Sequence, residues 1–162
     1  LFLPYLQGER TPHADPDARG AFSGLQLRHD RGALVRAVLE GVAFGLRDSL
    51  DVVRSLGIEV SSARASGGGA RSELWLRICA SVLDLPIERT VVEEGSAFGA
   101  ALLGVVAGGV FADVREAVAG AVRTKDLVEP DPAWREAYGE LRSRYRALYP
   151  ALRDLSGSTV AG

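Results

Sequence analysis

Methionine is absent from the 162-residue sequence, and cysteine and lysine occur once each, as Cys79 and Lys125. Without a methionine, Leu1 is not expected to be the natural start, so we expect the chain to be a piece of a longer protein. A single cysteine excludes a disulfide framework and a cysteine-rich zinc site, and it fits a reducing compartment such as the cytoplasm.

The sequence also has no long apolar run and no excess of charge of one sign. No uncharged run approaches the roughly 18 residues of a membrane span, and no charged-then-apolar leader opens the chain. The 19 basic and 21 acidic residues give a formal net charge of −2, without the basic excess of a nucleic-acid or membrane-surface binder. We therefore expect neither nucleic acid nor membrane as a partner.

What is present fits one globular domain. Apolar residues make up 47% and charged residues 25% of the chain, which is close to the average of folded proteins and excludes a disordered chain. The length is that of one domain. We place this domain at residues 1–155 and a tail at 156–162.

The residue pattern predicts alternating strands and helices, which indicates an α/β fold. Residues 7–24 are rich in Gly, Pro, Asp and Arg and predict a long ordered loop. The expected strands lie near 1–6, 60–66 and 86–92. The expected helices cover 31–56, 72–84, 95–107, 113–119 and 133–149, and the last dozen residues are expected to fray.

Local signals mark the ends of two of these helices. Asp30 and Ser72 are expected N-caps, and Gly57 suits the left-handed position past a helix end. Gly41 and Gly45 lie inside the first helix, where each costs about 1 kcal/mol relative to alanine. We expect another element to approach the helix closely there.

The strongest local motif is Ser66-Gly67-Gly68-Gly69-Ala70-Arg71-Ser72, between an expected strand and helix. Glycines let the backbone turn sharply and approach a ligand, and the start of a helix favours negative charge. The motif therefore favours a nucleotide or phosphate site, with a plain strand-to-helix turn as the alternative. It lacks the Gly-Lys-Ser/Thr of a P-loop and the spacing of a dinucleotide fingerprint.

Other reactive residue types have simpler explanations. For His13 and His29, backbone-bonded loop histidines are favoured over a zinc site. Asp15 and Asp17 could bind Mg²⁺, but Asp-Pro and Asp-Ala steps favour a turn.

The remaining candidates also have structural explanations. Cys79, Trp75 and Trp134 fall on helix faces and are expected to pack. Glu93 and Glu94 precede a helix, where the dipole stabilises acids. No complete acid–base pair, triad or metal cluster is present, so we name no catalytic and no metal-binding residue.

Three stretches resemble the C-terminal domain of the FGGY carbohydrate kinases, most of all its xylulose-phosphorylating members. The first two are Phe2–His13, continuing through Asp15-Pro16 and Ala18–Gly20, and Gly24-Leu25 with Arg36–Phe44. The third is Gly67–Ser72 with Trp75, followed by Gly95–Ala101. They span residues 2–104.

The resemblance implies an actin-like, ribonuclease-H-like ATPase fold in which two domains clasp ATP. It implies Mg²⁺-dependent transfer of the ATP γ-phosphate to D-xylulose, giving D-xylulose 5-phosphate. Gly68, Gly69 and Ala70 would line the adenine and ribose of ATP or ADP, with Arg71 and Glu73 beside them. Gly67 completes the expected ATP-binding set.

The family's catalytic aspartate and most sugar contacts are expected upstream of this chain. The pentulose would therefore bind through an N-terminal domain, and the isolated chain is expected to be inactive. A surface that this domain would cover is expected to be bare and to favour association, including a homodimer. The alternatives are a family member acting on gluconate, glycerol or another pentulose, and a non-catalytic actin-like nucleotide-binding module.

Overall fold

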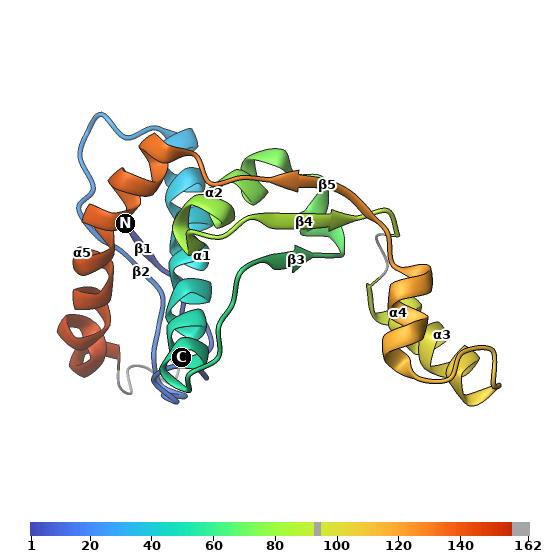
Figure 1. Ribbon diagram of the computed structural model, residues 1–162. Helices are drawn as coiled ribbons and strands as arrows, with labels where there is room; N and C mark the ends of the chain where they lie inside the picture. The colour runs from blue at the N-terminus through green and yellow to red at the C-terminus, as the bar shows by residue number, and fades with distance from the viewer. Residues whose placement is uncertain (93–94, 157–162) are drawn as a thin grey trace.

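A long helix, α1 (Arg31–Ser55), forms the centre of the computed structural model, which describes residues 1–92 and 95–156. It packs against α2 (Glu73–Leu83) and α5 (Pro132–Ser156), and against the short strand β1 (Phe2–Leu3). Figure 1 shows these elements as one body, from which a small sheet leads to α3 (Gly95–Ala107) and α4 (Val114–Ala121).

That sheet has the order β3-β4-β5, with β4 in the middle. Strand β3 (Ala63–Ala65) pairs parallel to β4 (Ile87–Thr90), and β5 (Thr124–Val128) pairs antiparallel to β4. A separate antiparallel pair joins β1 to β2 (Ala21–Phe22). The α/β prediction is therefore confirmed. Strand β5 was not expected, and β2 lies inside the loop predicted over 7–24. The strands expected near 1–6, 60–66 and 86–92 are shorter than predicted.

The predicted helix ends are confirmed by their capping atoms. Asp30 Oδ1 accepts a hydrogen bond from the Ala33 N–H at 2.8 Å, and Ser72 Oγ accepts one from the Trp75 N–H at 3.2 Å. Gly57 adopts φ +79° after the end of α1. Each satisfies backbone groups that a helix end leaves unpaired, or allows the turn that follows it.

The end predicted for the last helix is wrong. We expected it to stop at Tyr149 and the chain to fray, but α5 continues through Pro150 to Ser156. A proline removes one helical hydrogen bond. The helix persists because Tyr149 and Leu152, on either side of Pro150, pack against the core.

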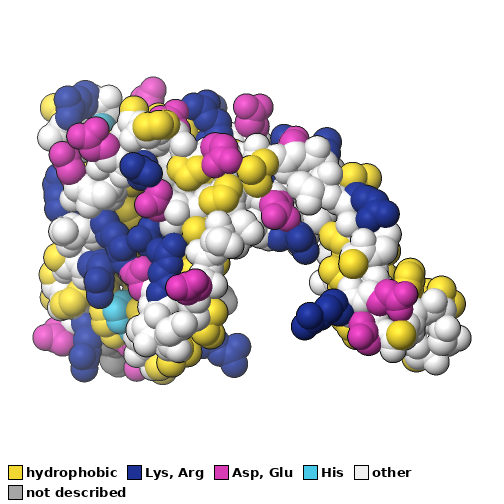
Figure 2. Space-filling view, viewed as in Figure 1, with side chains coloured by type: hydrophobic (Ala, Val, Ile, Leu, Met, Phe, Trp, Pro, Cys, Tyr) yellow, Lys and Arg dark blue, Asp and Glu magenta, His cyan; other side chains and the backbone are white. Residues whose placement is uncertain are grey.

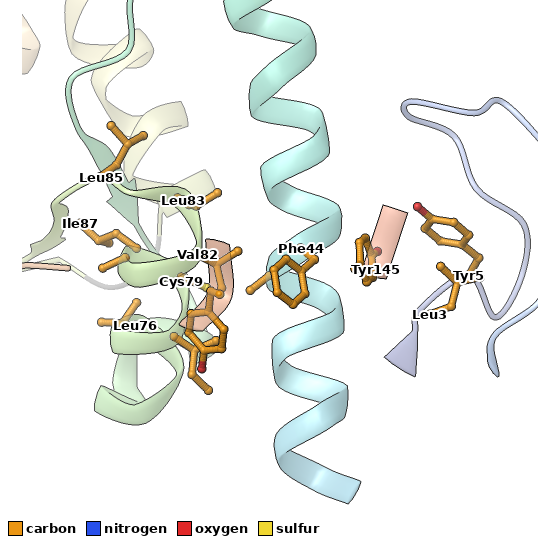
Figure 3. Close-up of a cluster of buried hydrophobic side chains, with 14 of the residues drawn as sticks. Leu3, Tyr5, Phe44, Leu76, Cys79, Val82, Leu83, Leu85, Ile87 and Tyr145 are labelled. Carbon is orange, nitrogen blue, oxygen red and sulfur yellow. The ribbon is translucent and has the colours of Figure 1, made fainter. Parts of the chain in front are cut away.

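The core lies where α1, α2, α5 and β1 meet (Figure 3). Phe44 of α1 stacks on Tyr145 of α5, with 4.9 Å between ring centroids, and meets Tyr138 edge-on at 5.9 Å. These rings and the apolar face of α2, which includes Cys79, fix the body to which the sheet is attached. In the part of the chain that the structure describes, no helix has the length and apolarity needed to cross a membrane.

Candidate nucleotide-binding cleft

The glycine turn forms the wall of an open cleft at the point where β3 ends. Gly67 has φ +78° and ψ −168°, and residues Gly68–Arg71 then make one 3-10 turn. The Ala70 N–H donates to the Gly67 carbonyl oxygen at 3.1 Å, and the Ser72 N–H donates to that of Gly69 at 3.2 Å. The cleft has a volume of about 490 Å³ and is lined by Ser66, Gly67, Gly68, Arg71, Gly95, Ser96 and Ala97.

The three glycines meet three different requirements. Gly67 has a positive φ, which side chains other than glycine rarely adopt. A Cβ on Gly68 would meet no atom within 4 Å, so this backbone is open to a ligand. A Cβ on Gly69 would lie 3.2 Å from Nε1 of Trp75, so Gly69 makes room for the indole.

The opposite wall is the start of α3. A Cβ on Gly95 would lie 2.6 Å from Oγ and 3.0 Å from Cβ of Ser66, so glycine is what lets α3 begin against the end of β3. The first N–H groups of a helix have no partner within the helix and favour anions. Figure 2 shows the hollow between the main body and the α3–α4 pair.

Arg71 is the one charged side chain among the described residues that line the cleft. A guanidinium, exposed backbone N–H groups and a helix start together suit a ligand that carries negative charge and presents a flat face to the glycines. Among residues 1–92 and 95–156, those that line the cleft include no acid, histidine or cysteine, and their backbone, hydroxyl and guanidinium groups are suited to binding.

The structure brings together part of the predicted set. Gly67, Gly68 and Arg71 line the cleft, whereas Gly69 does not line it and Ala70 is buried at 9% exposure. Glu73 is exposed in the first turn of α2 and does not line the cleft.

Sequence reasoning did not name Gly95, Ser96 and Ala97 as site residues, and it included Ser66 only as part of the glycine motif. The Gly-Ser-Ala run before an apolar helix was the available signal, but its position opposite Gly67 depends on the fold.

Several smaller predictions are confirmed. His29 Nδ1 accepts a hydrogen bond from the Gln26 N–H at 3.1 Å, and Asp15 Oδ1 accepts one from the Asp17 N–H at 2.9 Å, as in a turn. Cys79 is buried, and burial raises the pKa of its thiol to about 12.

The other candidates are placed as follows. His13 stacks on Tyr149, and the Trp134 ring lies beneath the guanidinium groups of Arg36 and Arg77. Glu93 and Glu94 lie outside the described residues. Residues 1–92 and 95–156 contain no group of three or more His, Cys, Asp or Glu side chains placed to hold a metal ion.

Comparison with solved structures defines the class. The chain superimposes on a xylulose kinase from Brucella ovis with a TM-score of 0.86 and 46% identity, over 95% of this chain and 32% of that one. A gluconate kinase from Lactobacillus acidophilus gives a TM-score of 0.84 and 30% identity, over 98% and 31%. The fold is thus the α/β fold of actin-like, ribonuclease-H-like ATPases.

The family follows from the sequence. Residues 1–108 match the FGGY family of carbohydrate kinases, C-terminal domain. The xylulose kinase of Staphylococcus epidermidis strain RP62A is 36% identical over 160 residues, which is 99% of this chain. The chain belongs to the FGGY family of carbohydrate kinases, and it spans about one third of the length of these relatives, 32% in the last case.

Proposed function

We propose that this chain supplies the glycine-turn wall of the ATP site in a kinase that phosphorylates D-xylulose. The observation that supports this most directly is the open cleft between Gly67–Gly68 and the start of α3, with Arg71 at its side. Membership of the FGGY family and the similarity to xylulose kinases support the choice of reaction.

In the proposed arrangement the adenosine part of ATP or ADP lies along the backbone of Gly67, Gly68 and Gly69. Ala70 supports the turn from behind, and Arg71 and Glu73 lie at the edge of the site. Gly68 leaves room for a flat base because no atom occupies the space that its side chain would take. The helix start at Gly95 then favours negative charge on the same ligand.

The proposed reaction breaks the bond between the γ-phosphorus and the oxygen bridging it to the β-phosphate. A new bond forms between the γ-phosphorus and a hydroxyl oxygen of the sugar, whose proton passes to a base. Transfer of this kind depends on positioned phosphates and an oriented hydroxyl. We place the base and most sugar contacts in an N-terminal domain outside this chain, so the chain alone is inactive.

Mg²⁺ is proposed on the basis of the family alone, and we assign none of the described residues to it. A cytoplasmic location is proposed because one unpaired cysteine suits a reducing compartment. The domain limits 1–155, with a tail at 156–162, also stay a prediction. A panel of xylulose, gluconate and glycerol given to the full-length enzyme tests which substrate is used.

Calorimetric titration of the chain with ATP and ADP tests the site. Gly68→Leu fills the cleft without requiring a positive φ, so nucleotide binding should be lost while the fold is kept. Gly139→Leu is the matched control, because Gly139 of α5 also faces open space but lies outside the cleft. Absence of binding to the folded chain, or equal loss in both variants, would contradict the assignment.

ADP production gives a second reading of the same proposal. The purified chain should produce no ADP in response to D-xylulose. Xylulose-dependent ADP production by the chain alone would overturn the placement of the base in another domain, whatever the calorimetry shows.

A further inference from the structure

A second cavity, of about 370 Å³, lies between α1, α5 and the loop after β1, and shares no lining residue with the glycine cleft. Its volume is in the range of pockets that hold small molecules. Leu3, Tyr5, Asp48 and Tyr145 are buried and form its floor. Its exposed rim is formed by Pro12, His13, Val52, Ser55, Arg146 and Pro150.

The floor holds a buried hydroxyl group whose hydrogen-bonding capacity is not fully used. Tyr145 is 1% exposed, and among the described residues no group meets its Oη atom at full hydrogen-bond geometry; the Tyr5 side chain is the polar group that interacts with it. Figure 3 places this side chain between α1 and Tyr5. Buried polar atoms are nearly always hydrogen-bonded, so Tyr145 leaves a hydrogen bond to be made by whatever occupies the cavity.

A buried carboxylate lies on the same floor. Asp48 is 7% exposed, and its Oδ1 atom lies 3.7 Å from Nη2 of Arg142 and 3.9 Å from Nε of Arg146. Both distances exceed that of a hydrogen bond, and Arg142 pairs more closely with Asp51. Burial raises the pKa of the Asp48 carboxyl, and the two arginines and His13 oppose that rise only in part.

One wall of the cavity is aromatic. The His13 and Tyr149 rings stack with centroids 3.8 Å apart and planes 13° apart, and Tyr5 meets both edge-on at 5.7 and 5.9 Å. The Tyr149 hydroxyl donates to Asp15 Oδ2 at 2.8 Å, which fixes the ring. An apolar face of a ligand can pack against such rings while its polar groups reach the floor.

The charges around the cavity define the kind of ligand. Asp48 and Asp51 can accept hydrogen bonds, and Arg146 and Tyr145 can donate them. Because acidic and basic side chains both line the cavity, a strongly charged ligand of either sign would meet repulsion as well as attraction. An uncharged molecule with several neighbouring hydroxyl groups and an apolar C–H face satisfies the donors, the acceptors and the rings together.

We propose that this cavity is a second ligand site, which binds a small uncharged polyol or monosaccharide through Asp48, Tyr145 and the His13–Tyr149 stack. The site is independent of the nucleotide cleft and of the proposed kinase reaction. Ordered water alone is the competing occupant, since buried polar cavities also hold water.

Titration of the isotopically labelled chain with xylitol, followed by amide NMR, tests the proposal. We expect saturable shifts concentrated at His13, Val52, Ser55 and Arg146. Pentan-1-ol, with the same carbon chain and a single hydroxyl, should produce none of them. Absence of saturable shifts with xylitol, as expected for a cavity that holds only water, would overturn the proposal, as would equal shifts with pentan-1-ol.

Two tyrosine variants on α5 locate the site. Tyr145→Phe removes one hydrogen bond to the ligand and should weaken xylitol binding about three- to tenfold. Tyr138→Phe, also buried but outside the cavity, should bind xylitol as the unaltered chain does. Equal weakening in the two variants would contradict a site on Tyr145.

A substitution at the exposed rim tests the site without changing the buried floor residues, whose replacement could disturb folding. Ser55→Trp places an indole at the exposed mouth of the cavity and should abolish xylitol binding. ATP binding should be the same in this variant as in the unaltered chain, so loss of one site is distinguished from loss of the other. Full xylitol binding by Ser55→Trp would count against the cavity as the site.

Discussion

Gly41 of α1 lies against the backbone of Phe2 in β1, so closely that a Cβ on Gly41 would overlap the Phe2 carbonyl oxygen. That Cβ would also lie 3.1 Å from the Phe2 carbonyl carbon. Strand β1 has little room to retreat, because Phe2 pairs with Phe22 in β2 and their ring centroids are 4.6 Å apart. The packing of β1 against α1 offsets the free-energy cost of placing glycine inside a helix. It confirms the close approach predicted for Gly41.

Gly41→Ala should therefore lower the free energy of unfolding by about 1–3 kcal/mol, as overpacking against fixed atoms does. Urea unfolding followed by tryptophan fluorescence measures the change. Gly139→Ala is the control: its Cβ would meet nothing within 4 Å, so it should stabilise the chain by up to about 1 kcal/mol. Destabilisation of the two variants by the same amount would show that the Phe2 contact is not the cause.

The features predicted correctly from the sequence depend on near neighbours in the chain. Asp30 and Ser72 cap helices by accepting hydrogen bonds from residues three positions later. The turn at Gly67 depends on the positive φ of that residue itself. Gly45 was predicted less well. A Cβ there would lie 3.6 Å from Tyr145 Oη and 3.9 Å from Pro4 Cγ, which is ordinary contact and not a close approach.

The features that were missed depend on distant residues. The five residues of β5 include Lys125 and Asp126, which weaken any strand pattern, and β5 is held by pairing with β4 and by the Arg89–Asp126 ion pair. Only the fold brings Gly95 against Ser66. The sequence therefore predicted the glycine wall of the cleft, but not the wall that faces it.

Asp131 should make the stability of the chain depend on pH in acid. Its Oδ1 atom accepts from the Ala133 and Trp134 N–H groups at 3.0 and 3.2 Å, and its Oδ2 atom accepts from Arg77 at 2.9 Å. The backbone hydrogen bond from Trp134, aided by Arg77, lowers the pKa of this carboxyl in the folded state. The folded state therefore binds this proton more weakly than the unfolded state does.

The stabilisation from Asp131 is complete above the unfolded pKa of about 3.9 and is lost as the pH falls through the lower folded value. Asp131→Asn should reduce the fall in unfolding free energy below about pH 4, as measured by urea titrations at several pH values. An unchanged acid slope in Asp131→Asn would contradict this account.

Cys79 should be unreactive while the chain is folded. It is 4% exposed, and burial raises the pKa of its thiol to about 12, so little thiolate forms at pH 8. Reaction with Ellman's reagent at pH 8 should be slow in buffer and fast in urea. Ser61→Cys adds a thiol at an exposed position, so it should react at once in buffer while Cys79 stays protected. A single fast phase for both thiols would contradict burial of Cys79.

Self-association is expected from one face of α1. Val35, Val42 and Leu46 are 55%, 37% and 46% exposed, and their spacing of seven and four residues places them on one stripe. A stripe of this kind favours contact with another apolar surface, so sedimentation equilibrium should show a mass that rises with concentration. Leu46→Glu should return the chain to the monomer mass. Leu155→Glu, at an exposed position near the end of α5, should leave the association unchanged. A monomer mass at every concentration, or equal loss of association in both variants, would show that the α1 stripe does not drive it.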